Sequence, residues 1–316
     1  MPPLLERIGV ELPVVQAGMG GGISRHELAA AVSEAGGLGT IAVNGAEAIR
    51  RELAAARART GRPLAVNVLL PFARRDWFEA AGEADVVVSF WGEPRRRTGG
   101  VWLHQCGSVE EARAAQVAGA DGVIVQGVEA GGHVRGTTPA LQLLEEAKRV
   151  LPADYPVLLA GGIAERADVS AALDAGATAA VAGTRFLLSE ESRAHALYKE
   201  RLLAAEETLL TELFAAGWPA PHRVVPNAAT KHWGEPPRLN RALNRLLAPG
   251  ARYAPAGLQL RMIRAQRPGS RLLSPATPID DLPSTFVDSG PLYAGETVSR
   301  IGELRRAADL VRDLAP

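Results

Sequence analysis

The chain has 316 residues, of which 47% are apolar and 5% aromatic, and its 35 basic and 35 acidic residues give a net charge of zero. The length suffices for one large domain or two smaller ones, and the balanced charge excludes an overall field that would attract nucleic acid or an anionic membrane. The single cysteine, Cys106, excludes an intrachain disulfide, and no signal peptide or apolar run of membrane-spanning length is recognisable, so we expect a cytoplasmic protein.

Short apolar strands alternate with amphipathic helices through the first two thirds of the chain. The predicted strands are residues 13–16, 38–43, 64–70, 85–90, 101–105, 122–125, 156–160 and 178–181. The predicted helices are residues 25–34, 46–58, 74–81, 109–118, 140–150, 167–174 and 192–203, with Ser24 and Thr138 as N-caps and Pro139 at a first helical position. This alternation predicts an α/β protein with a (β/α)8 barrel, the TIM-barrel fold.

One repeat of the predicted barrel lacks its helix. Only GEPRRRTGG lies between Trp91 and Val101, and a parallel crossover that contains a helix needs about a dozen residues or more. We therefore expect an extended connection and a thin place in the ring of helices.

The pattern changes after Glu207, where Pro and Trp become frequent. Residues 240–247 and 258–267 have helical periodicity, and residues 296–314 predict a final amphipathic helix. We predict three parts: a barrel of residues 1–207, a smaller, partly helical second domain of residues 208–289 on the substrate side, and a C-terminal segment of residues 290–316 that returns to the barrel.

The stretch VQGVEAGGHVRG, residues 125–136, follows the sixth strand and contains four glycines, Glu129 and His133. Glycine tolerates positive φ and lets a backbone approach a ligand closely. A strand that ends in such a loop is typical of α/β enzyme sites, so His133 is the candidate catalytic residue. Glu129 either braces the loop through backbone N–H groups or takes part in catalysis.

Glycines also follow the seventh and eighth strands, at Gly161, Gly162 and Gly183, with Thr184 next in sequence. In barrels these two loops often bind phosphate through backbone N–H groups. The chain contains neither a GxGxxG fingerprint nor a GxxxxGK[ST] loop, which favours a mononucleotide.

Two amides lie at other predicted strand ends. Strand one leads into Ala17, Gly18 and Met19, where a flat ring could lie against bare backbone. Asn67 and Gln126 offer amide donors and acceptors that suit the heteroatom edge of a flavin. They would serve equally well as buried groups that satisfy neighbouring backbone.

Several of these segments together resemble the nitronate monooxygenase family, formerly called 2-nitropropane dioxygenase. They are VVQAGMGGGIS, AVSEAGGLGTIA, VNVLL, VVVSFWGEP, QGVEAGGHVRG, AGGIA, AGTRFLLSEES and YAGETVSRI. The EAGGH loop also resembles FMN-dependent enoyl-[acyl-carrier-protein] reductases. Three departures from the family pattern stand out: Gly18 where Pro is frequent, Val181 where Gln is frequent, and the missing helix after the fourth strand.

The resemblance implies an FMN-dependent enzyme that oxidises alkyl nitronates with O2 to a carbonyl compound and nitrite. It implies FMN contacts from Ala17, Gly18, Met19, Asn67, Gln126, Gly131, Gly132, Gly161, Gly162, Gly183 and Thr184, with His133 as the catalytic histidine. The alternative is an NAD(P)H-dependent FMN reductase of an enoyl thioester or quinone. The expected partners are a small-molecule substrate and O2, with a homodimer left open.

The histidines have different expected roles. A neutral His133 imidazole could remove the α-proton of a nitroalkane, or it could orient a nitronate that is already an anion. His26 and His104 are expected to be structural, whereas His222 and His232, close in sequence to Trp218 and Trp233, are candidates for the substrate side. No HExxH motif is present, and we expect no metal.

Overall fold

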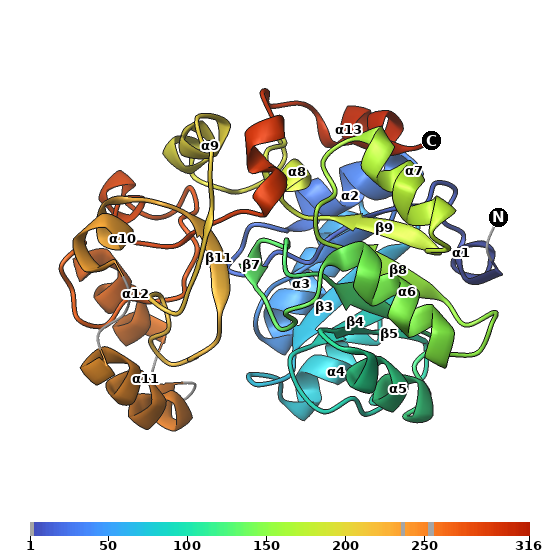
Figure 1. Cartoon of the computed structure of the whole chain (residues 1–316), viewed down its shortest axis with the longest axis horizontal. Helices are drawn as coiled ribbons and strands as arrows, with labels where there is room; N and C mark the ends of the chain where they lie inside the picture. Colours follow the sequence, from blue (N-terminus) through green and yellow to red (C-terminus); the bar gives the residue numbers. More distant parts are fainter. Residues whose placement is uncertain (1–2, 235–237, 252–255) are drawn as a thin grey trace.

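Eight parallel strands close into a barrel in the computed structural model, which describes residues 3–234, 238–251 and 256–316 (Figure 1). The strands are β1 (Val14–Gln16), β2 (Gly39–Ile41), β3 (Leu64–Leu69), β4 (Val86–Phe90), β5 (Val101–Cys106), β6 (Gly122–Gln126), β8 (Val157–Ala160) and β9 (Ala179–Ala182). Their order is β1-β9-β8-β6-β5-β4-β3-β2, and a parallel bridge between Val15 and Leu38 joins the two ends. The predicted (β/α)8 barrel is confirmed.

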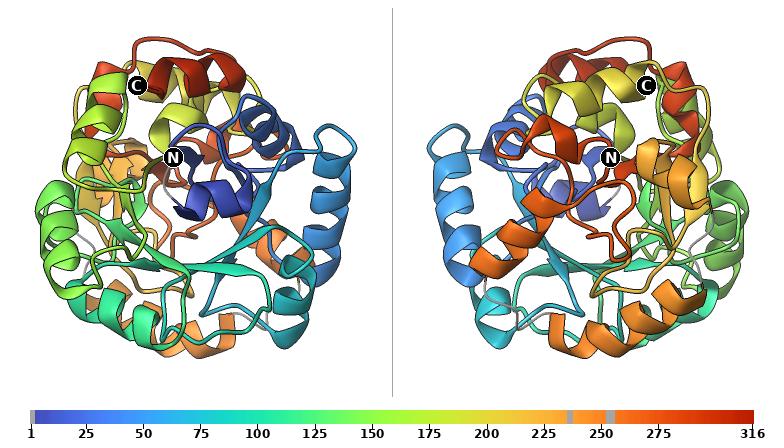
Figure 2. Two further views of the ribbon diagram at one scale, coloured as in Figure 1. Left: turned by 90° about the vertical axis from the view of Figure 1, so that its right-hand side faces the viewer. Right: turned by 90° about the vertical axis from the view of Figure 1, so that its left-hand side faces the viewer.

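The strands are buried on both faces, as their continuous apolar runs require. Along β4, Val86 and Val88 point into the barrel while Val87 packs outward against the helices. Helix α1 (Pro3–Ile8) adds Leu4 and Leu5 to the inner cluster. In the left view of Figure 2 this helix lies across the centre of the ring, so it closes the end of the barrel away from β7.

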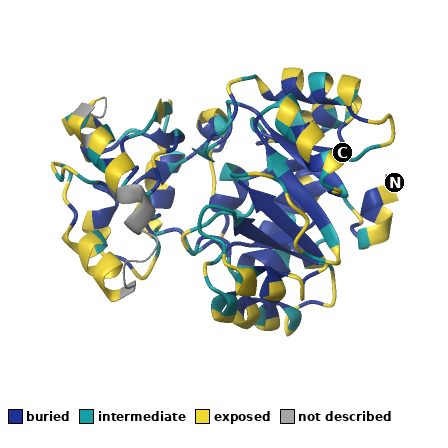
Figure 3. Ribbon diagram, turned by 90° about the horizontal axis from the view of Figure 1, so that it is seen from below, coloured by how far each residue is buried: buried dark blue, intermediate teal, exposed yellow. Residues whose placement is uncertain are grey.

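The outer layer consists of α2 (His26–Glu34), α3 (Ala46–Arg57), α4 (Arg75–Ala81), α5 (Val109–Val117), α6 (Ala140–Val150), α7 (Arg166–Asp174), α8 (Thr184–Leu187) and α13 (Ala307–Leu314). Helix α9 (Ala196–Leu203) instead contacts residues 296–300 and shares a buried cluster with Val225 and Leu292. Figure 3 shows buried strands inside and helices exposed along their outer sides. Residues 91–100, all of them described, form an extended connection without a helix, as expected. Among the described helices, none combines the length and apolarity needed to cross a membrane.

A second, four-stranded sheet lies beside the barrel. It consists of β10 (Leu209–Thr211), β11 (His222–Val225), β12 (Leu292–Tyr293) and the two-residue strand β7 (Gly132–His133), which comes from the loop between β6 and α6. Helices α10 (Ala228–Trp233), α11 (Arg238–Ala251) and α12 (Ala256–Ala265) accompany it, the last two where helices were predicted (Figure 1). Because this sheet takes strands from all three predicted parts of the chain, the division at residues 207 and 289 stays a prediction.

Several predicted helix boundaries are wrong. Ser24 is not an N-cap: α2 begins after Arg25, and the Ser24 hydroxyl instead accepts the Met19 N–H at 3.0 Å. Pro139, rather than Thr138, is the residue before α6. Residues 296–314 do not form one helix, because a 3-10 turn, η2 (Glu296–Arg300), is separated from α13 by an extended segment. The helix predicted at residues 192–203 begins only at Ala196, after the separate short helix α8. A further 3-10 turn, η1 (Ser284–Phe286), precedes β12.

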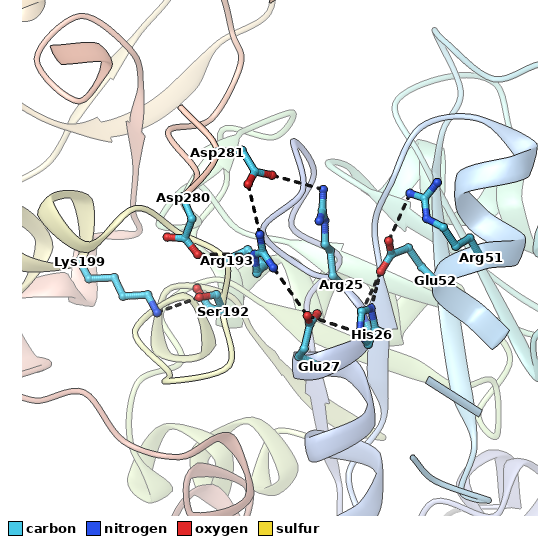
Figure 4. Close-up of polar contacts among 10 residues, drawn as sticks. All are labelled: Arg25, His26, Glu27, Arg51, Glu52, Ser192, Arg193, Lys199, Asp280 and Asp281. Atoms are coloured by element: carbon cyan, nitrogen blue, oxygen red, sulfur yellow. Dashed lines mark hydrogen bonds and ion pairs between the residues drawn. The ribbon is translucent and has the colours of Figure 1, made fainter. Parts of the chain in front are cut away.

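A polar network joins α2 to the segments on either side of it (Figure 4). The His26 Nδ1 lies 2.7 Å from a Glu52 oxygen, and Arg193 lies within 3.7 Å of Glu27 and 3.4 Å of Asp281. The side-chain ligand atoms of His26, Glu27 and Glu52 are close enough together to share a cation. Arg51 pairs with Glu52 and Arg193 with Glu27, and the further pair of Arg193 with Asp281 joins the barrel to the C-terminal part of the chain.

Candidate active site

A large cavity of about 1610 Å³ lies at the carboxyl ends of the barrel strands. All twelve residues proposed from the sequence line it: Ala17, Gly18, Met19, Asn67, Gln126, Gly131, Gly132, His133, Gly161, Gly162, Gly183 and Thr184. The fold therefore brings together residues that lie far apart in the sequence, because parallel strands end on the same face of a barrel. Their individual roles stay predictions.

The loops after β8 and β9 present bare backbone to this cavity. Gly161 and Gly162 have φ values of +109° and +76°, a conformation that favours glycine. A Cβ on Gly162 would meet no atom within 4 Å, so this stretch of backbone borders open space. The Thr184 hydroxyl, at the start of α8, accepts the Gly295 N–H at 2.9 Å and still has its own proton to donate.

The loop after β1 is shaped by close packing and by one serine. A side chain at Gly18 would overlap Asn67, so only glycine lets this loop lie against Asn67. The Gln16 amide donates to the Ser24 hydroxyl at 2.9 Å and accepts the Thr40 N–H at 2.9 Å. Gln16, which the sequence reasoning did not select, thus supports the loop from beneath.

Gln126 braces the loop that carries His133. Its amide N–H donates to the His133 carbonyl at 3.1 Å, and its amide oxygen accepts the Arg135 N–H at 3.2 Å. The backbone-satisfying role left open in the sequence is therefore one that this side chain performs. Any contact with a cofactor would have to be made alongside these two bonds.

The second sheet holds the His133 loop in place. His133 pairs with His222, and Gly132 with Arg223, in antiparallel register, and the Val134 N–H donates to the Pro221 carbonyl at 2.9 Å. These pairings join the candidate catalytic residue to a strand about ninety positions later in the chain. Nothing in the local sequence signals this long-range pairing, and it was not predicted.

Arg223 and Glu129 secure the rest of this loop. The Arg223 guanidinium donates to the Val128 carbonyl at 2.8 Å and pairs with Glu296 at 2.8 Å. Both Glu129 carboxylate oxygens lie 3.0 Å from the Ala140 N–H, at the start of α6. Of the two roles considered for Glu129, bracing is the one its contacts support, since its carboxylate caps a helix whose positive end favours an anion.

The His133 ring lies among aromatic side chains. It stacks on Trp218, with ring centroids 3.7 Å apart, and it lies 5.4 Å from His222 and 5.5 Å from Tyr293. Its Nε2 is buried and has no hydrogen-bond partner among the described residues. Burial, reinforced by His222, lowers the pKa of His133 well below its usual value, so the ring is neutral at pH 7.

His222 is a structural neighbour and not a cavity-lining residue. It is fully buried, its Nδ1 donates to the Ala220 carbonyl at 2.9 Å, and its Nε2 accepts the Phe214 N–H at 3.2 Å. Burial lowers the pKa of His222 to about 4, so it too is neutral. His232 packs on Trp233 away from the cavity, so the expectation that these two histidines line the substrate side is wrong.

The two histidines expected to be structural have structural contacts. His104 is buried, with its Nδ1 2.8 Å from the Ser89 hydroxyl, and burial lowers its pKa to about 4. His26 belongs to the ion-pair network of α2. Cys106 is buried in the barrel wall, and burial raises its pKa, so it is an unreactive thiol.

Trp91 and Trp218 complete the aromatic surroundings of His133, and neither was selected from the sequence as a site residue. Trp91 directly follows β4 and has a φ of +66°, a conformation uncommon for a bulky residue and typical of functional sites. The Arg135 guanidinium lies 5.3 Å from its ring centroid. The position of Trp91 at a strand end was the available sequence signal.

Comparison with known proteins identifies similar sequences and folds. A family model described as nitronate monooxygenase matches residues 1–85 and 93–316. A nitronate monooxygenase of Pseudomonas aeruginosa is 34% identical over 267 residues, covering 65% of this chain and 74% of that relative. A (3aS,4S,5R,7aS)-5-hydroxy-7a-methyl-1-oxo-octahydro-1H-indene-4-carboxyl-CoA dehydrogenase of Mycobacterium tuberculosis is 35% identical over 243 residues, which cover 71% of this chain and 65% of that relative's length.

Two solved structures are similar over almost the whole chain. FabK from Thermotoga maritima has a TM-score of 0.81 at 28% identity, covering 99% of this chain and 94% of that one. A nitroalkane oxidase from Streptomyces ansochromogenes has a TM-score of 0.75 at 30% identity, covering 98% of this chain and 96% of that one. The family model leaves residues 86–92 of this chain unmatched, and these residues form β4 and the start of the connection that lacks a helix.

Proposed function

Because this chain belongs to the nitronate monooxygenase family, we propose that it binds FMN in the cavity and oxidises alkyl nitronates with O2, giving a carbonyl compound and nitrite. One observation carries the proposal. A neutral imidazole with an unpartnered, buried Nε2 lies on the wall of a cavity whose other walls include glycine backbone. The family is generally flavin-dependent, and the choice of FMN rests on this chain's own residues.

The donor set fits a mononucleotide flavin. The phosphate would be held by the backbone N–H groups of Gly161 and Gly162 together with Gly183 and the Thr184 hydroxyl. The open space in front of Gly162 leaves room for it. The ring system would lie near Gly18 and Met19, with Asn67 at its heteroatom edge. FMN, when bound, supplies the acceptor for the electrons that leave the substrate carbon.

His133 has two possible tasks, and its surroundings favour one of them. To act as a base on a neutral nitroalkane, its ring nitrogen would take the α-proton as the C–H bond breaks, leaving an imidazolium and a nitronate. Because burial lowers the pKa of His133, the imidazolium is disfavoured and the ring is a weak base at pH 7. We therefore assign it to orienting a nitronate that is already deprotonated, through a hydrogen bond from its ring.

Oxygen consumption tests this function. FMN-loaded protein is mixed with ethyl nitronate in air-saturated buffer, and O2 uptake and nitrite are measured together. We expect O2 uptake that depends on both the protein and the nitronate, with nitrite formed as O2 is consumed. Absence of O2 uptake by protein that carries stoichiometric FMN would overturn the proposal.

A second function is favoured by the size of the cavity and is kept as the alternative. Its volume of about 1610 Å³ exceeds the roughly 300–1,000 Å³ of ordinary ligand pockets. That leaves space for a larger substrate, such as an enoyl thioester or quinone, reduced with NAD(P)H. Anaerobic mixing with NADH or NADPH separates the two functions, since rapid loss of the yellow colour would support the reductase and overturn the oxygenase as the main activity.

A further inference from the structure

Trp218 covers His133. The two rings stack with their planes 20° apart, and the Trp218 ring also meets Trp91 and Phe72 edge-on, with centroids 5.3 Å away in each case. These three neighbours come from the loops after β6, β4 and β3. Only 9% of Trp218 is exposed, so contacts from three loops fix the orientation of its indole.

The backbone around Trp218 is held as well. Residues 212–221 connect β10 to β11, and Gly217 has a φ of +83°. The Ala216 N–H donates to the Leu273 carbonyl at 3.0 Å, and the Trp218 N–H donates to the Ala215 carbonyl at 3.0 Å. Ala216, Gly217 and Trp218 all line the cavity. The second sheet therefore supplies a side chain to the site as well as holding the His133 loop.

The stack contains two buried polar atoms without a hydrogen bond among the described residues, Trp218 Nε1 and His133 Nε2. Three other aromatic side chains of this protein have a partner for their polar atom. Trp102 Nε1 donates to the Ser89 hydroxyl at 2.7 Å, Trp233 Nε1 donates to the Pro268 carbonyl at 2.9 Å, and the Tyr293 hydroxyl donates to the Pro275 carbonyl at 2.9 Å. A buried polar atom without a hydrogen bond is costly in free energy, so two of them in one stack, on the wall of the cavity, point to a ligand that bonds to both. The indole N–H needs an acceptor, whereas a neutral imidazole nitrogen donates or accepts according to its tautomer.

We propose that Trp218 is a substrate-binding residue whose Nε1–H donates to an oxygen of the substrate's reacting group, while its indole face holds the His133 imidazole. An indole N–H can only donate, so the ligand must carry an acceptor oxygen. A nitronate has two such oxygens and a negative charge, which makes the hydrogen bond stronger. His133 and Trp218, on rings 3.7 Å apart, are close enough to bind one small oxygen-bearing group together. This inference rests on the proposed function, because it takes the nitronate as the ligand.

Propionate is a suitable probe, because its carboxylate resembles a nitronate in charge and shape and cannot be oxidised here. It is titrated into FMN-loaded protein, and its Kd is read from the perturbation of the flavin absorption band. Trp218→Phe keeps an aromatic ring on His133 but removes the N–H, and we expect its Kd for propionate to rise about 10- to 100-fold. Trp233→Phe, which removes an indole N–H bonded outside the cavity, is the matched control and should leave the Kd unchanged.

A double-mutant cycle tests whether the two rings act on the same group. If both bind one oxygen-bearing end of the ligand, His133→Asn combined with Trp218→Phe should raise the Kd by less than the product of the single changes. If Trp218→Phe does not fold or does not retain FMN, benzothienylalanine at position 218 keeps the indole shape without the N–H and should give the same rise.

An unchanged Kd for propionate in Trp218→Phe or in the benzothienylalanine protein, or no propionate binding by the wild type, would overturn the role of Trp218. These results are separate from a failure of the proposed function. Wild-type protein that consumes O2 with ethyl nitronate while Trp218→Phe binds propionate normally would keep the function and remove Trp218 from the site. A Kd for propionate that rises in Trp218→Phe, together with no O2 uptake by the wild type, would keep Trp218 as a ligand-binding residue and overturn the proposed function.

Discussion

Gly131 and Gly132 are adjacent and line the same cavity, but alanine should affect them differently. A Cβ on Gly131 would lie 2.5 Å from the Ala294 carbonyl carbon and 2.5 Å from the Gly295 nitrogen. These are backbone atoms that cannot rotate away, so Gly131→Ala must separate the His133 loop from residues 294–296. Overpacking costs about 1–3 kcal/mol, and loss of the Glu296 N–H bond to the Glu129 carbonyl, 3.0 Å long, adds about 0.5–1.5 kcal/mol.

We therefore expect Gly131→Ala to lower the free energy of unfolding by about 2–4 kcal/mol. A Cβ on Gly132 would meet no atom within 4 Å, but its φ of +75° disfavours alanine, so Gly132→Ala should cost only about 1–2 kcal/mol. Activity should fall further in Gly131→Ala, because a shift of about 1 Å in a catalytic group can cost about 10²-fold in rate.

Urea unfolding of both variants at equal FMN loading measures the difference in midpoint, and O2 uptake with ethyl nitronate measures the activity. Equal destabilisation of the two variants, or an unfolding midpoint of Gly131→Ala at the wild-type value, would refute the inferred contact between the loop and residues 294–296.

Three further predictions concern the phosphate loop, the imidazole and pH. Gly162→Asp should abolish FMN binding, because it places a carboxylate where a phosphate needs bare N–H groups; unchanged flavin content in a folded variant would move the phosphate elsewhere. His133→Asn should lower O2 uptake to a similar extent with ethyl nitronate and with neutral nitroethane, at fixed flavin occupancy; an additional loss of about 10²–10⁴-fold on the neutral form alone would instead establish a base. The free energy of unfolding should fall as the pH falls from 6.5 towards 4, because His104 and His222 have folded-state pKa values of about 4 against an ordinary value of 6.5, so the unfolded state binds more protons. Each histidine should lower the free energy of unfolding by up to about 3 kcal/mol by pH 4. Urea unfolding that shows stability rising as the pH falls would contradict the assignment of both rings as neutral.

The barrel and the site could be predicted because both depend on short-range patterns. Each strand is an apolar run bounded by turn residues, and a parallel barrel places every strand end on one face. Identifying the glycine loops after 122–125, 156–160 and 178–181 was therefore enough to bring distant residues into one cavity, once the strands were assigned.

The second sheet could not be predicted in the same way. Strand β11 is HRVV, four residues with no clear alternation, and its partner β7 is two residues of a glycine-rich loop. Neither stretch has enough periodic residues to indicate a strand, and the pairing is set by tertiary contact rather than by local propensity. Trp218 was not predicted as a site residue because its stacking on His133 depends on the pairing of β7 with β11.

The predicted helix caps were wrong because a residue of capping type caps a helix only if no other group bonds to it or to the helix N–H. The Ser24 hydroxyl is engaged by the loop after β1. The first N–H of α6 is capped by Glu129, eleven positions upstream of Ala140 and on the far side of the glycine-rich loop. A carboxylate that folds back over such a distance has no sequence signature of the capping-box kind.

The identity of the bound cofactor is the measurement that tests the central claim most directly. Protein purified without added flavin is heated, and the released chromophore is identified by chromatography against FMN and FAD. We predict a yellow protein that releases FMN stoichiometrically, because the cavity contains one set of glycines that we propose to bind phosphate and the sequence has no dinucleotide fingerprint. Release of FAD, or a colourless protein that does not take up added FMN, would contradict it.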